Sequence, residues 1–277
     1  MTARPLAVLL PPRPEPTAPR LLAQTWLLAA LVLALCAGTA WAQAVAQQTG
    51  RPGALAIMLR WAPLITSGFL LNVMVSVLAM ALGTLLGLPL GLSLIARTRP
   101  LRLLGWGVTQ FFRNVPWLVL LFYIMFLLPF ELHLGGLVLP VPAWFKAVIG
   151  LALPVSANVA EIVRGGMQSI PEPQWSAADS LAFTRWQTIS RIILPQALRR
   201  MLPPWMNLYA ILTMATTLIS VIGIQDGLTL TRAAIAAESR PELMVPMYIF
   251  LLLLFFAYCY PIARLTLALE RRVQVRI

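Results

Sequence analysis

Acidic and metal-ligating side chains are scarce in this sequence. The chain of 277 residues holds nine aspartate and glutamate residues, one histidine and two cysteines. A zinc site or an active site embedded in a membrane needs several such groups close together. Cys36 and Cys259 lie inside apolar runs, which favours packing over a disulfide. The sequence therefore predicts no metal site and no catalytic residues.

A nucleotide-binding loop is also missing. The pattern G-x-x-x-x-G-K-[ST] does not occur, and the residues outside the apolar runs are too few to fold into an ATPase domain. No repeat of solenoid length is visible. If ATP drives this protein, a separate chain must bind it, so no cofactor is expected here.

Long apolar runs dominate what is present. Hydrophobic residues make up 60% of the chain and charged residues only 11%. Several runs are long enough to cross a hydrocarbon layer of ~30 Å as helices rising ~1.5 Å per residue. The sequence therefore predicts an all-α, polytopic helical membrane protein. The runs cover about residues 21–41, 66–96, 103–130, 143–163, 204–224 and 243–262.

The first run leaves two alternatives open. Residues 1–20 are rich in proline and arginine, and Ala40-Trp41-Ala42 is similar to a signal-peptidase site. A cleaved signal peptide would leave five spans, whereas an uncleaved segment would give six. We favour the uncleaved span. Both versions divide the chain into an N-terminal segment, 1–50, and a transmembrane domain, 60–277.

Basic residues predict the orientation. The net charge of +12 would suggest nucleic acid for a soluble protein, but in a membrane protein basic residues favour cytoplasmic loops. Five of the 21 lie in proposed outside segments (Arg51, Arg60, Lys146, Arg232, Arg240), Arg113 lies within a run, and fifteen lie in proposed inside segments. The C-terminus and residues 175–195 are thus predicted to be cytoplasmic. The inside set is Arg4, Arg13, Arg20, Arg97, Arg99, Arg102, Arg164, Arg185, Arg191, Arg199, Arg200, Arg264, Arg271, Arg272 and Arg276.

Residues 175–195 are too polar to span a membrane. Ser169 with Glu172, and Thr184 with Gln187, have the spacing of capping boxes, so each pair predicts the start of a short helix. After Thr184, an apolar stripe of Trp186, Ile189, Ile192 and Ile193 is expected on one face. This face requires a packing partner.

The same stretch resembles the EAA loop of ATP-binding cassette (ABC) importer permeases, which docks on the cytoplasmic ATPase. The matches are Ala177, Ala178, Ile192, Leu194 and Pro195, whereas Ser176 replaces the usual glutamate and Ala182 the usual glycine. Alanine at positive φ costs about 1–2 kcal/mol, so we expect a different turn geometry here. The resemblance implies a coupling loop at about 165–200. Its candidate contacts are Trp175, Ser176, Ala177, Ala178, Asp179, Ala182, Arg185, Trp186 and Pro195.

From about residue 65 onward the chain is similar to the polar amino acid branch of these permeases. The ordered motifs include Phe-Arg-Asn-Val-Pro at 112–116, Ala-Glu-Ile-Val-Arg-Gly-Gly at 160–166 and Thr-Thr-Leu-Ile-Ser-Val-Ile-Gly at 216–223. The resemblance implies a type I importer domain in the bacterial inner membrane, among lipid. It also implies ATPase partners, a second permease subunit that is the same or different, and a periplasmic substrate-binding protein.

Polar residues inside the runs are candidates for the substrate path. Arg113 lies deep in its run, so it must face a wet cavity, a carboxylate or the interface. In one alternative, Arg113 and Asn114 bind a substrate carboxylate, and Pro116 breaks the helix so that freed backbone groups can help. In the other, Arg113 is a snorkelling or interface arginine beside a structural kink. Thr213, Thr216, Thr217 and Ser220 predict one polar stripe, although hydroxyls also bond to their own helix. Asn158 completes the candidate set.

Glu161 and Arg164 are three residues apart and predict an i,i+3 ion pair. We favour a structural role for this pair. The alternative is a link that transmits motion to the loop, with Gly165 and Gly166 either acting as a hinge or ending the helix.

The leading function is therefore an importer permease for polar amino acids, without enzymatic activity of its own. Two alternatives remain: a membrane enzyme acting on lipid-like substrates, and an ABC permease for another small polar solute. An ion-coupled transporter would need buried acids and an inverted repeat, and the sequence displays neither.

Overall fold

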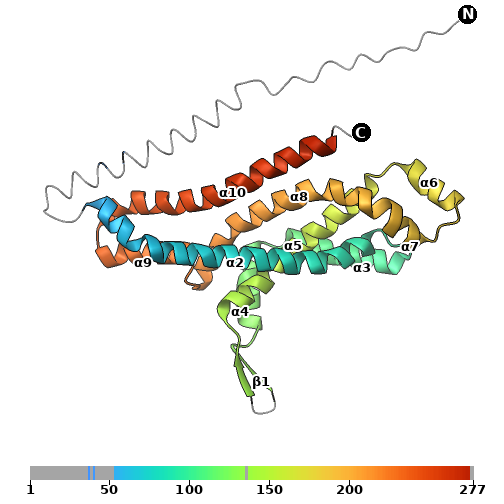
Figure 1. Cartoon of the computed structure of the whole chain (residues 1–277). Coiled ribbons are helices and arrows are strands. Elements are labelled where there is room, and N and C mark those ends of the chain that lie inside the picture. Colours follow the sequence, from blue (N-terminus) through green and yellow to red (C-terminus); the bar gives the residue numbers. More distant parts are fainter. Residues whose placement is uncertain (1–36, 38–39, 41–52, 135–136, 275–277) are drawn as a thin grey trace, which may run out of the picture.

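The computed structural model describes residues 37, 40, 53–134 and 137–274 (Figure 1). The predicted first span or signal segment at 21–41 falls outside these residues, apart from positions 37 and 40. Within the described part, four helices are long and apolar enough to cross a membrane, and a bent helix pair would make a fifth. The predicted fold class, a polytopic helical membrane protein, is confirmed.

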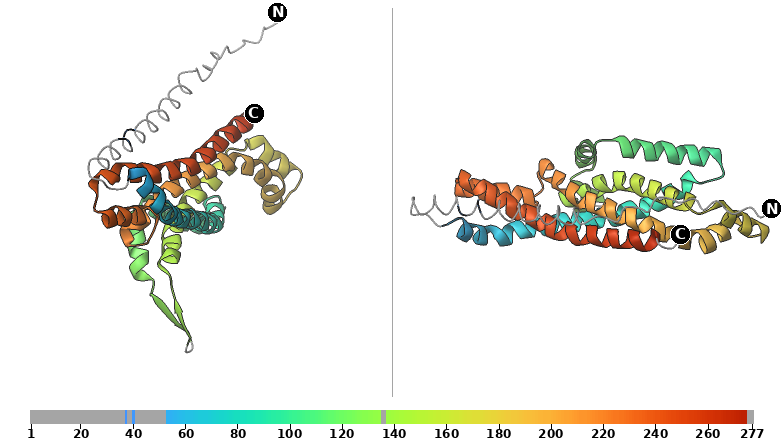
Figure 2. Two further views of the ribbon diagram at one scale, coloured as in Figure 1. Left: turned by 60° about the vertical axis from the view of Figure 1, so that its left-hand side comes forward. Right: turned by 90° about the horizontal axis from the view of Figure 1, so that it is seen from above.

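Four long helices lie along a common axis: α2 (Ala54–Leu94), α5 (Ala143–Gln168), α8 (Leu194–Ala215) and α10 (Met244–Gln274) (Figures 1 and 2). The main hydrophobic core lies between α2, α5 and α8. It holds fully buried side chains such as Val75, Leu151, Val155 and Leu212. The core therefore fixes α5 and α8, the two helices that carry the site described below.

Helices α2 and α5 pack at very short distance through glycines. Gly83, Gly87 and Gly91 recur every four residues and form a groove along α2. A Cβ at Gly87 would lie 2.6 Å from the Ser156 carbonyl oxygen and 2.6 Å from Cβ of Val159. The backbones can approach this closely only because these positions lack a side chain.

The run predicted at 103–130 is broken at Pro116, as the sequence indicated. It therefore does not form one straight span. Helix α3 (Arg99–Asn114) ends before Pro116, and α4 (Trp117–Leu127) leaves it at 103°. Val115 is extended because the proline ring disfavours helical geometry at the preceding residue. Helix α4 consequently projects away from the bundle.

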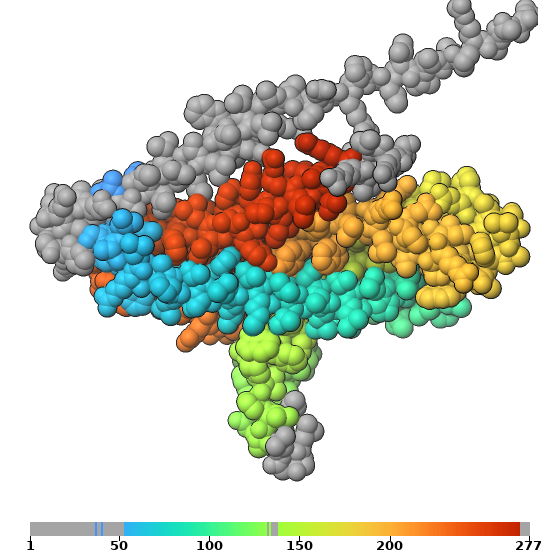
Figure 3. Space-filling view, viewed as in Figure 1, coloured from blue at the N-terminus to red at the C-terminus, as the bar shows by residue number. Residues whose placement is uncertain are grey.

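A β-hairpin, which was not expected from the sequence, continues this projection. Strands β1 (Glu131–Leu134) and β2 (Leu137–Pro140) are antiparallel, with Glu131 opposite Pro140. Together α4 and the hairpin form an arm that stands out from the bundle (Figure 3). The buried Lys146 Nζ anchors its base by donating to the carbonyls of Leu128 (2.9 Å) and Met125 (3.3 Å), and it lies 3.4 Å from the centre of the Phe130 ring.

The predicted span near 204–224 begins much earlier than expected. Helix α7 (Arg185–Gln187) continues through the π-helical turn η1 (Thr188–Ile193) and α8 into the 3₁₀ segment η2 (Thr216–Ile222). Residues Arg185–Ile222 thus make one continuous helical span. Pro195 lies at the start of α8, directly after the π-helical turn η1, and it does not interrupt the span.

The opposite end of the bundle is closed by α9 (Gly227–Glu238) and the short η3 (Pro241–Leu243). Helix α2 starts at Ala54 rather than near residue 66, because its first turns pair with α9. The Glu238 carboxylate accepts a hydrogen bond from Trp61 Nε1 (2.8 Å) and lies 4.0 Å from Arg60 Nη1. Helices α6 (Glu172–Ser180) and α7 lie at the other end (Figure 1).

Candidate functional site

A groove of about 500 Å³ runs between α5 and α8 and is bordered by the last turn of α3. On α8, Arg200, Pro204, Asn207 and Ile211 line it at intervals of four, three and four residues, which place them on one helical face. Asn158, Glu161, Gly165 and Ser169 line the opposite wall on α5. The groove therefore follows α5 towards the end of the molecule that carries α6 and α7.

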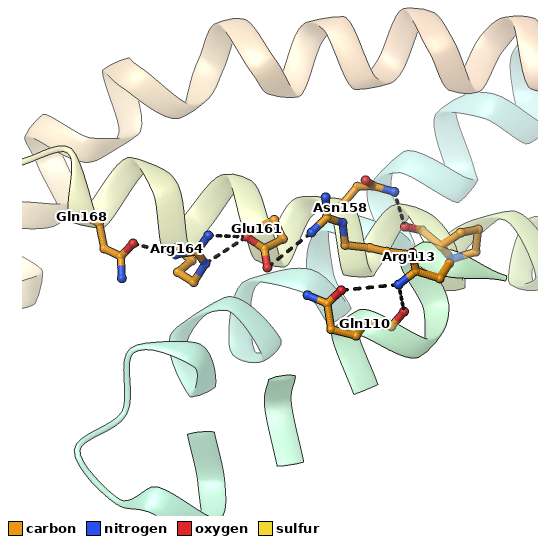
Figure 4. Close-up of polar contacts among 8 residues, drawn as sticks. Gln110, Arg113, Asn158, Glu161, Arg164 and Gln168 are labelled. Atoms are coloured by element: carbon orange, nitrogen blue, oxygen red, sulfur yellow. Dashed lines mark hydrogen bonds and ion pairs between the residues drawn. The ribbon is translucent and has the colours of Figure 1, made fainter. Parts of the chain in front are cut away.

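Charged side chains form a chain along α5 (Figure 4). The Arg164 guanidinium donates two hydrogen bonds to Glu161 Oε2, at 2.9 and 2.7 Å, and a third to Gln168 Oε1 at 2.6 Å. Arg113 Nη1, from α3, lies 3.5 Å from Glu161 Oε1. The predicted Glu161–Arg164 pair is present, and Arg113 extends it to a second helix.

Arg113 has the surroundings that its depth in the run required. It faces a carboxylate and a groove, and 39% of its side chain is exposed, against 18% for Glu161. Its 3.5 Å contact is longer than either bond between Arg164 and Glu161. Arg113 therefore keeps donor capacity towards the groove, since a guanidinium carries five N–H groups.

Asn114 does not join Arg113, contrary to the prediction. Its amide nitrogen donates to the Gln110 carbonyl at 2.6 Å on the exposed side of α3, and it does not line the groove. Asn158 does line the groove, but its amide nitrogen is bound to the Pro154 carbonyl at 2.8 Å. Its amide oxygen and the second N–H of its amide nitrogen are left for a ligand.

The predicted hydroxyl stripe is not a single surface. Thr213, Thr216, Thr217 and Ser220 each donate to a carbonyl three or four residues earlier in the same helix. Residues 216–222 form a 3₁₀ helix, in which side chains three apart are aligned. Thr213 and Thr216 therefore share one buried column, whereas Thr217 and Ser220 share another, and none of the four lines the groove.

Arg200 and Asn207 belong to the groove but were not singled out as site residues. Arg200 Nη1 donates to the Ser169 carbonyl and links α8 to the end of α5. The spacing of Arg200, Pro204, Asn207 and Ile211 was visible in the sequence, and it could have identified this helical face. What it could not identify was the helix that faces it.

The stretch at 175–195 forms the expected pair of helical turns. Thr184 and Gln187 make both hydrogen bonds of the predicted capping box. The box predicted at Ser169 is wrong, because Ser169 still caps α5 and donates to the Gly166 carbonyl (2.7 Å). Pro171 is the N-cap of α6 instead.

The turn between α6 and α7 keeps positive φ without glycine. Ala182 has φ 55°, so the expectation of another geometry is wrong. The amides of Ala182 and Phe183 donate to the carbonyls of Asp179 (3.0 Å) and Ala178 (3.1 Å), the pattern of a Schellman cap. These bonds offset the cost of alanine in this conformation.

The side chains predicted to contact an ATPase separate into outward-facing and packed groups. Trp186 exposes 68% of its area and lies off the packed stripe, because the π-helical turn η1 shifts the register towards Ile189, Ile192 and Ile193. Trp175 instead packs inward, with the Arg185 guanidinium 4.7 Å from the centre of its ring. Ala178 is buried. Ser176, Ala177, Asp179, Ala182, Arg185 and Pro195 are exposed.

Across residues 53–134 and 137–274, no three histidine, cysteine or acidic side chains lie close enough to share a metal ion. The chemistry that the groove offers is therefore that of charged and amide groups. Guanidinium and carboxylate side chains can bind a molecule that carries both a carboxylate and an ammonium group.

Comparisons with known proteins identify relatives of this chain. Residues 79–275 match the family described as "Binding-protein-dependent transport system inner membrane component". The chain is 33% identical over 171 residues to the inner membrane amino-acid ABC transporter permease protein YhdY of Escherichia coli, covering 62% of this chain and 46% of the relative. It is 32% identical over 209 residues to the probable glutamine ABC transporter permease protein GlnM of Bacillus subtilis, covering 75% and 92%.

The chain thus spans about half the length of the E. coli relative. Among solved structures, it is similar to a chain from the crystal structure of an amino acid ABC transporter with histidines. That match has a TM-score of 0.69 and 27% sequence identity, and it covers 80% of this chain and 99% of the other.

Proposed function

Because the chain belongs to the family of binding-protein-dependent transport system inner membrane components, we propose that it is the permease subunit of an ATP-driven importer of polar amino acids. The names of the relatives support this substrate class, since they include amino-acid and glutamine permeases. The chain is a transport component without an ATPase of its own, so a separate subunit hydrolyses ATP.

The observation that carries the proposal is the Arg113–Glu161 pair at the groove. An amino acid presents a carboxylate and an ammonium group, and it can exchange with this pair. The carboxylate binds the Arg113 guanidinium while the ammonium binds Glu161. The exchange is favourable because the 3.5 Å contact is loose and Arg164 remains bound to Glu161, so no charge is left without a counter-ion.

The ATPase partner binds the segment at 175–195 in this proposal. Leu181 and Trp186 expose 71% and 68% of their area at the end of the molecule, as expected for apolar anchors of a protein contact. Helix α7 is continuous with α8, which carries Arg200 and Asn207. Movement of the segment is therefore passed directly to one wall of the groove.

The proposed importer function also implies the remaining partners and the location of the chain. A second permease subunit completes the path, and a periplasmic binding protein delivers the substrate. The chain spans the bacterial inner membrane several times among lipid, with its C-terminus in the cytoplasm. The excess of arginine at the end that carries α6 and α7 supports this orientation.

The test is ATP hydrolysis by the chain assembled with its ATPase subunit in lipid discs. Binding proteins loaded with different polar amino acids are added in turn. We expect one loaded binding protein to stimulate hydrolysis, and the same protein without its amino acid to have little effect. A stable complex that no loaded binding protein stimulates would contradict the proposed substrate class, and failure to form any complex would contradict the proposed partner.

A further inference from the structure

A buried polar cluster joins three segments beyond the end of the groove that is farther from α6 and α7. Asn72 of α2, Thr216 of η2 and Asp226 at the start of α9 are fully buried. The Asn72 amide nitrogen donates to Thr216 Oγ1 and to Asp226 Oδ2, both at 3.2 Å. The Asn72 amide oxygen accepts from the Gly227 backbone N–H at 3.0 Å. One side chain therefore holds partners that are 144 to 155 residues away in the sequence.

The segment that Asn72 holds has the features of a hinge. Residues 216–222 are 3₁₀ rather than α-helical, and Gly223 ends them with φ 83°. A 3₁₀ stretch within a long helix often marks a place where a chain bends, and glycine is suited to the left-handed conformation. The chain changes direction here between α8 and α9.

Helices α2 and α9 pack so closely that their junction has two arrangements, one in contact and one separated. A Cβ at Gly68 would lie 2.7 Å from the Asp226 carbonyl carbon, and one at Gly227 would lie 3.2 Å from the Phe69 backbone nitrogen. The backbones of α2 and α9 are therefore in direct contact around Asn72. Opening this contact requires the hydrogen bonds of Asn72 to break together, which gives two states rather than a gradual change.

The position of the cluster relative to the groove assigns it a role. The groove extends to Ser169 and Arg200 at the end that carries α6 and α7, whereas Thr213 of α8 and Thr216 of η2 are fully buried farther along the same span. In this chain the groove thus lies towards the proposed cytoplasmic end, and the helices beyond it are packed together.

We propose that Asn72 is a positioning residue that latches η2 and α9 against α2 while the path is open to the cytoplasm. Its three hydrogen bonds separate when the path opens outward. This inference rests on the proposed transport function, because an alternating path is what gives the latch a purpose. We call Asn72, Thr216 and Asp226 the latch.

The latch is tested by the access of a thiol reagent to a buried reporter. Ile224, which is 5% exposed beside Asp226, is replaced by cysteine in a chain whose Cys36 and Cys259 are serine. The full complex in spheroplasts is treated from outside with a maleimide that does not cross membranes. We expect Asn72→Asp to raise the labelling rate at least about tenfold without ATP, since it loses both hydrogen bonds that the Asn72 amide nitrogen donates and places a carboxylate beside that of Asp226.

An exchange of the two side chains separates a latch from a general loss of structure. In the double variant Asn72→Asp with Asp226→Asn, the new amide can donate to the new carboxylate, while the N–H groups of Gly227 and Thr229 keep their acceptors. Labelling should fall well below the rate of Asn72→Asp and reach that of Thr216→Val, because a carboxylate at position 72 still cannot donate to Thr216 Oγ1. Ser156→Ala is the matched control, because buried Ser156 bonds only within its own helix, to the Leu153 carbonyl.

The outcomes decide the proposal. Labelling of the Asn72→Asp chain no faster than that of Ser156→Ala would overturn the latch, as would a double variant that is labelled as fast as Asn72→Asp. If Asn72→Asp does not yield a folded complex, Thr216→Val leaves the bonds of Asn72 to Asp226 and Gly227 in place. It removes the bond from Asn72 and the bond within the helix to the Thr213 carbonyl, and it must still raise labelling for the latch to stand. Amino acid uptake by the unaltered complex is measured in parallel. Normal uptake with unchanged labelling refutes the latch alone, and no uptake with latch-dependent labelling refutes the transport proposal alone.

Discussion

The Arg113 guanidinium lies beside a carboxylate that a second arginine already holds. Arg164 makes two short bonds to Glu161, whereas Arg113 makes one contact at 3.5 Å. Glu161 is thus kept in place whether or not Arg113 stays bound to it. This asymmetry leaves Arg113 as the group of the pair that can turn to a carboxylate in the groove.

Replacing Arg113 tests this role. Arg113→Lys keeps the charge but loses the planar fork that binds a carboxylate through two parallel hydrogen bonds. We expect the KM for uptake to rise about tenfold, because a charge-assisted hydrogen bond contributes about 1.5–3 kcal/mol. Arg113→Gln should raise the KM further, because it also removes the charge. Uptake of the radiolabelled amino acid into proteoliposomes measures both variants.

Arg264→Gln is the matched control for that measurement. Arg264 lies exposed on α10 and does not line the groove, so its loss removes a charge without touching the proposed site. An equal rise in KM for Arg264→Gln and Arg113→Gln would mean that only net charge matters. No rise in either variant would remove Arg113 from the path.

At the scale of elements, the seam between α2 and α5 positions the site. Val155, Val159 and Val163 of α5 pack against Gly83, Gly87 and Gly91 of α2, while Asn158 and Glu161 of the same helix line the groove. The seam therefore sets the rotation of α5. A change in the seam should alter both stability and the direction in which Glu161 points.

Gly87→Ala tests the seam. The added methyl group would lie 2.6 Å from the Ser156 carbonyl oxygen, which is backbone and cannot move away by changing a rotamer. We expect a loss of about 1–3 kcal/mol in stability, the usual effect of overpacking. A lower midpoint of thermal unfolding for the purified protein in lipid discs would record it.

Gly107→Ala is the opposite case. No atom lies within 4 Å of a Cβ at this position in α3, and alanine favours a helix over glycine by about 1 kcal/mol. The midpoint of thermal unfolding should therefore stay the same or rise. If both substitutions lowered it equally, the close contact at Gly87 would not be the cause.

For the whole molecule, the continuous helical span Arg185–Ile222 connects the two ends of the mechanism. Its first turn belongs to the segment proposed to bind the ATPase, its middle carries Arg200 and Asn207 of the groove, and its last part contains Thr216 of the latch. Displacement at one end can reach the other without passing through a loop. Stiffness of this helix is thus part of the proposed mechanism.

Glycine at the exposed residues Leu198 and Leu202 tests the stiffness. Each substitution lowers helix propensity by about 1 kcal/mol, and neither removes a side chain of the groove or of the latch. We expect ATP hydrolysis to persist while uptake per ATP falls about tenfold, because a flexible helix moves without displacing the groove wall. Parallel measurements of uptake and phosphate release in proteoliposomes give this ratio.

Glycine at Leu103 and Leu104 provides the control. These leucines are also exposed, but they lie on α3, outside the connecting helix. Uptake per ATP should remain unchanged there. An equal fall in both double variants would indicate general destabilisation rather than loss of coupling.

Sequence patterns predicted the class of the protein, the break at Pro116, the capping box of Thr184 and the pairing of Glu161 with Arg164. Each of these depends on neighbours within a few residues or on the sum of apolar area along a run, and both quantities can be read locally. The expectations at Ser169 and Ala182 were wrong because the end of α5 and the cap of α6 decided those positions.

Tertiary packing determines which helices face one another. It brought Arg113 to Glu161, Arg200 to the end of α5, and Asn72 to Thr216 and Asp226, and it separated Asn114 from the groove. These contacts depend on the rotation of each helix about its axis, which close packing such as that of α2 on α5 sets. A hydropathy pattern leaves that rotation free, because residues that face lipid and residues that face the core are equally apolar.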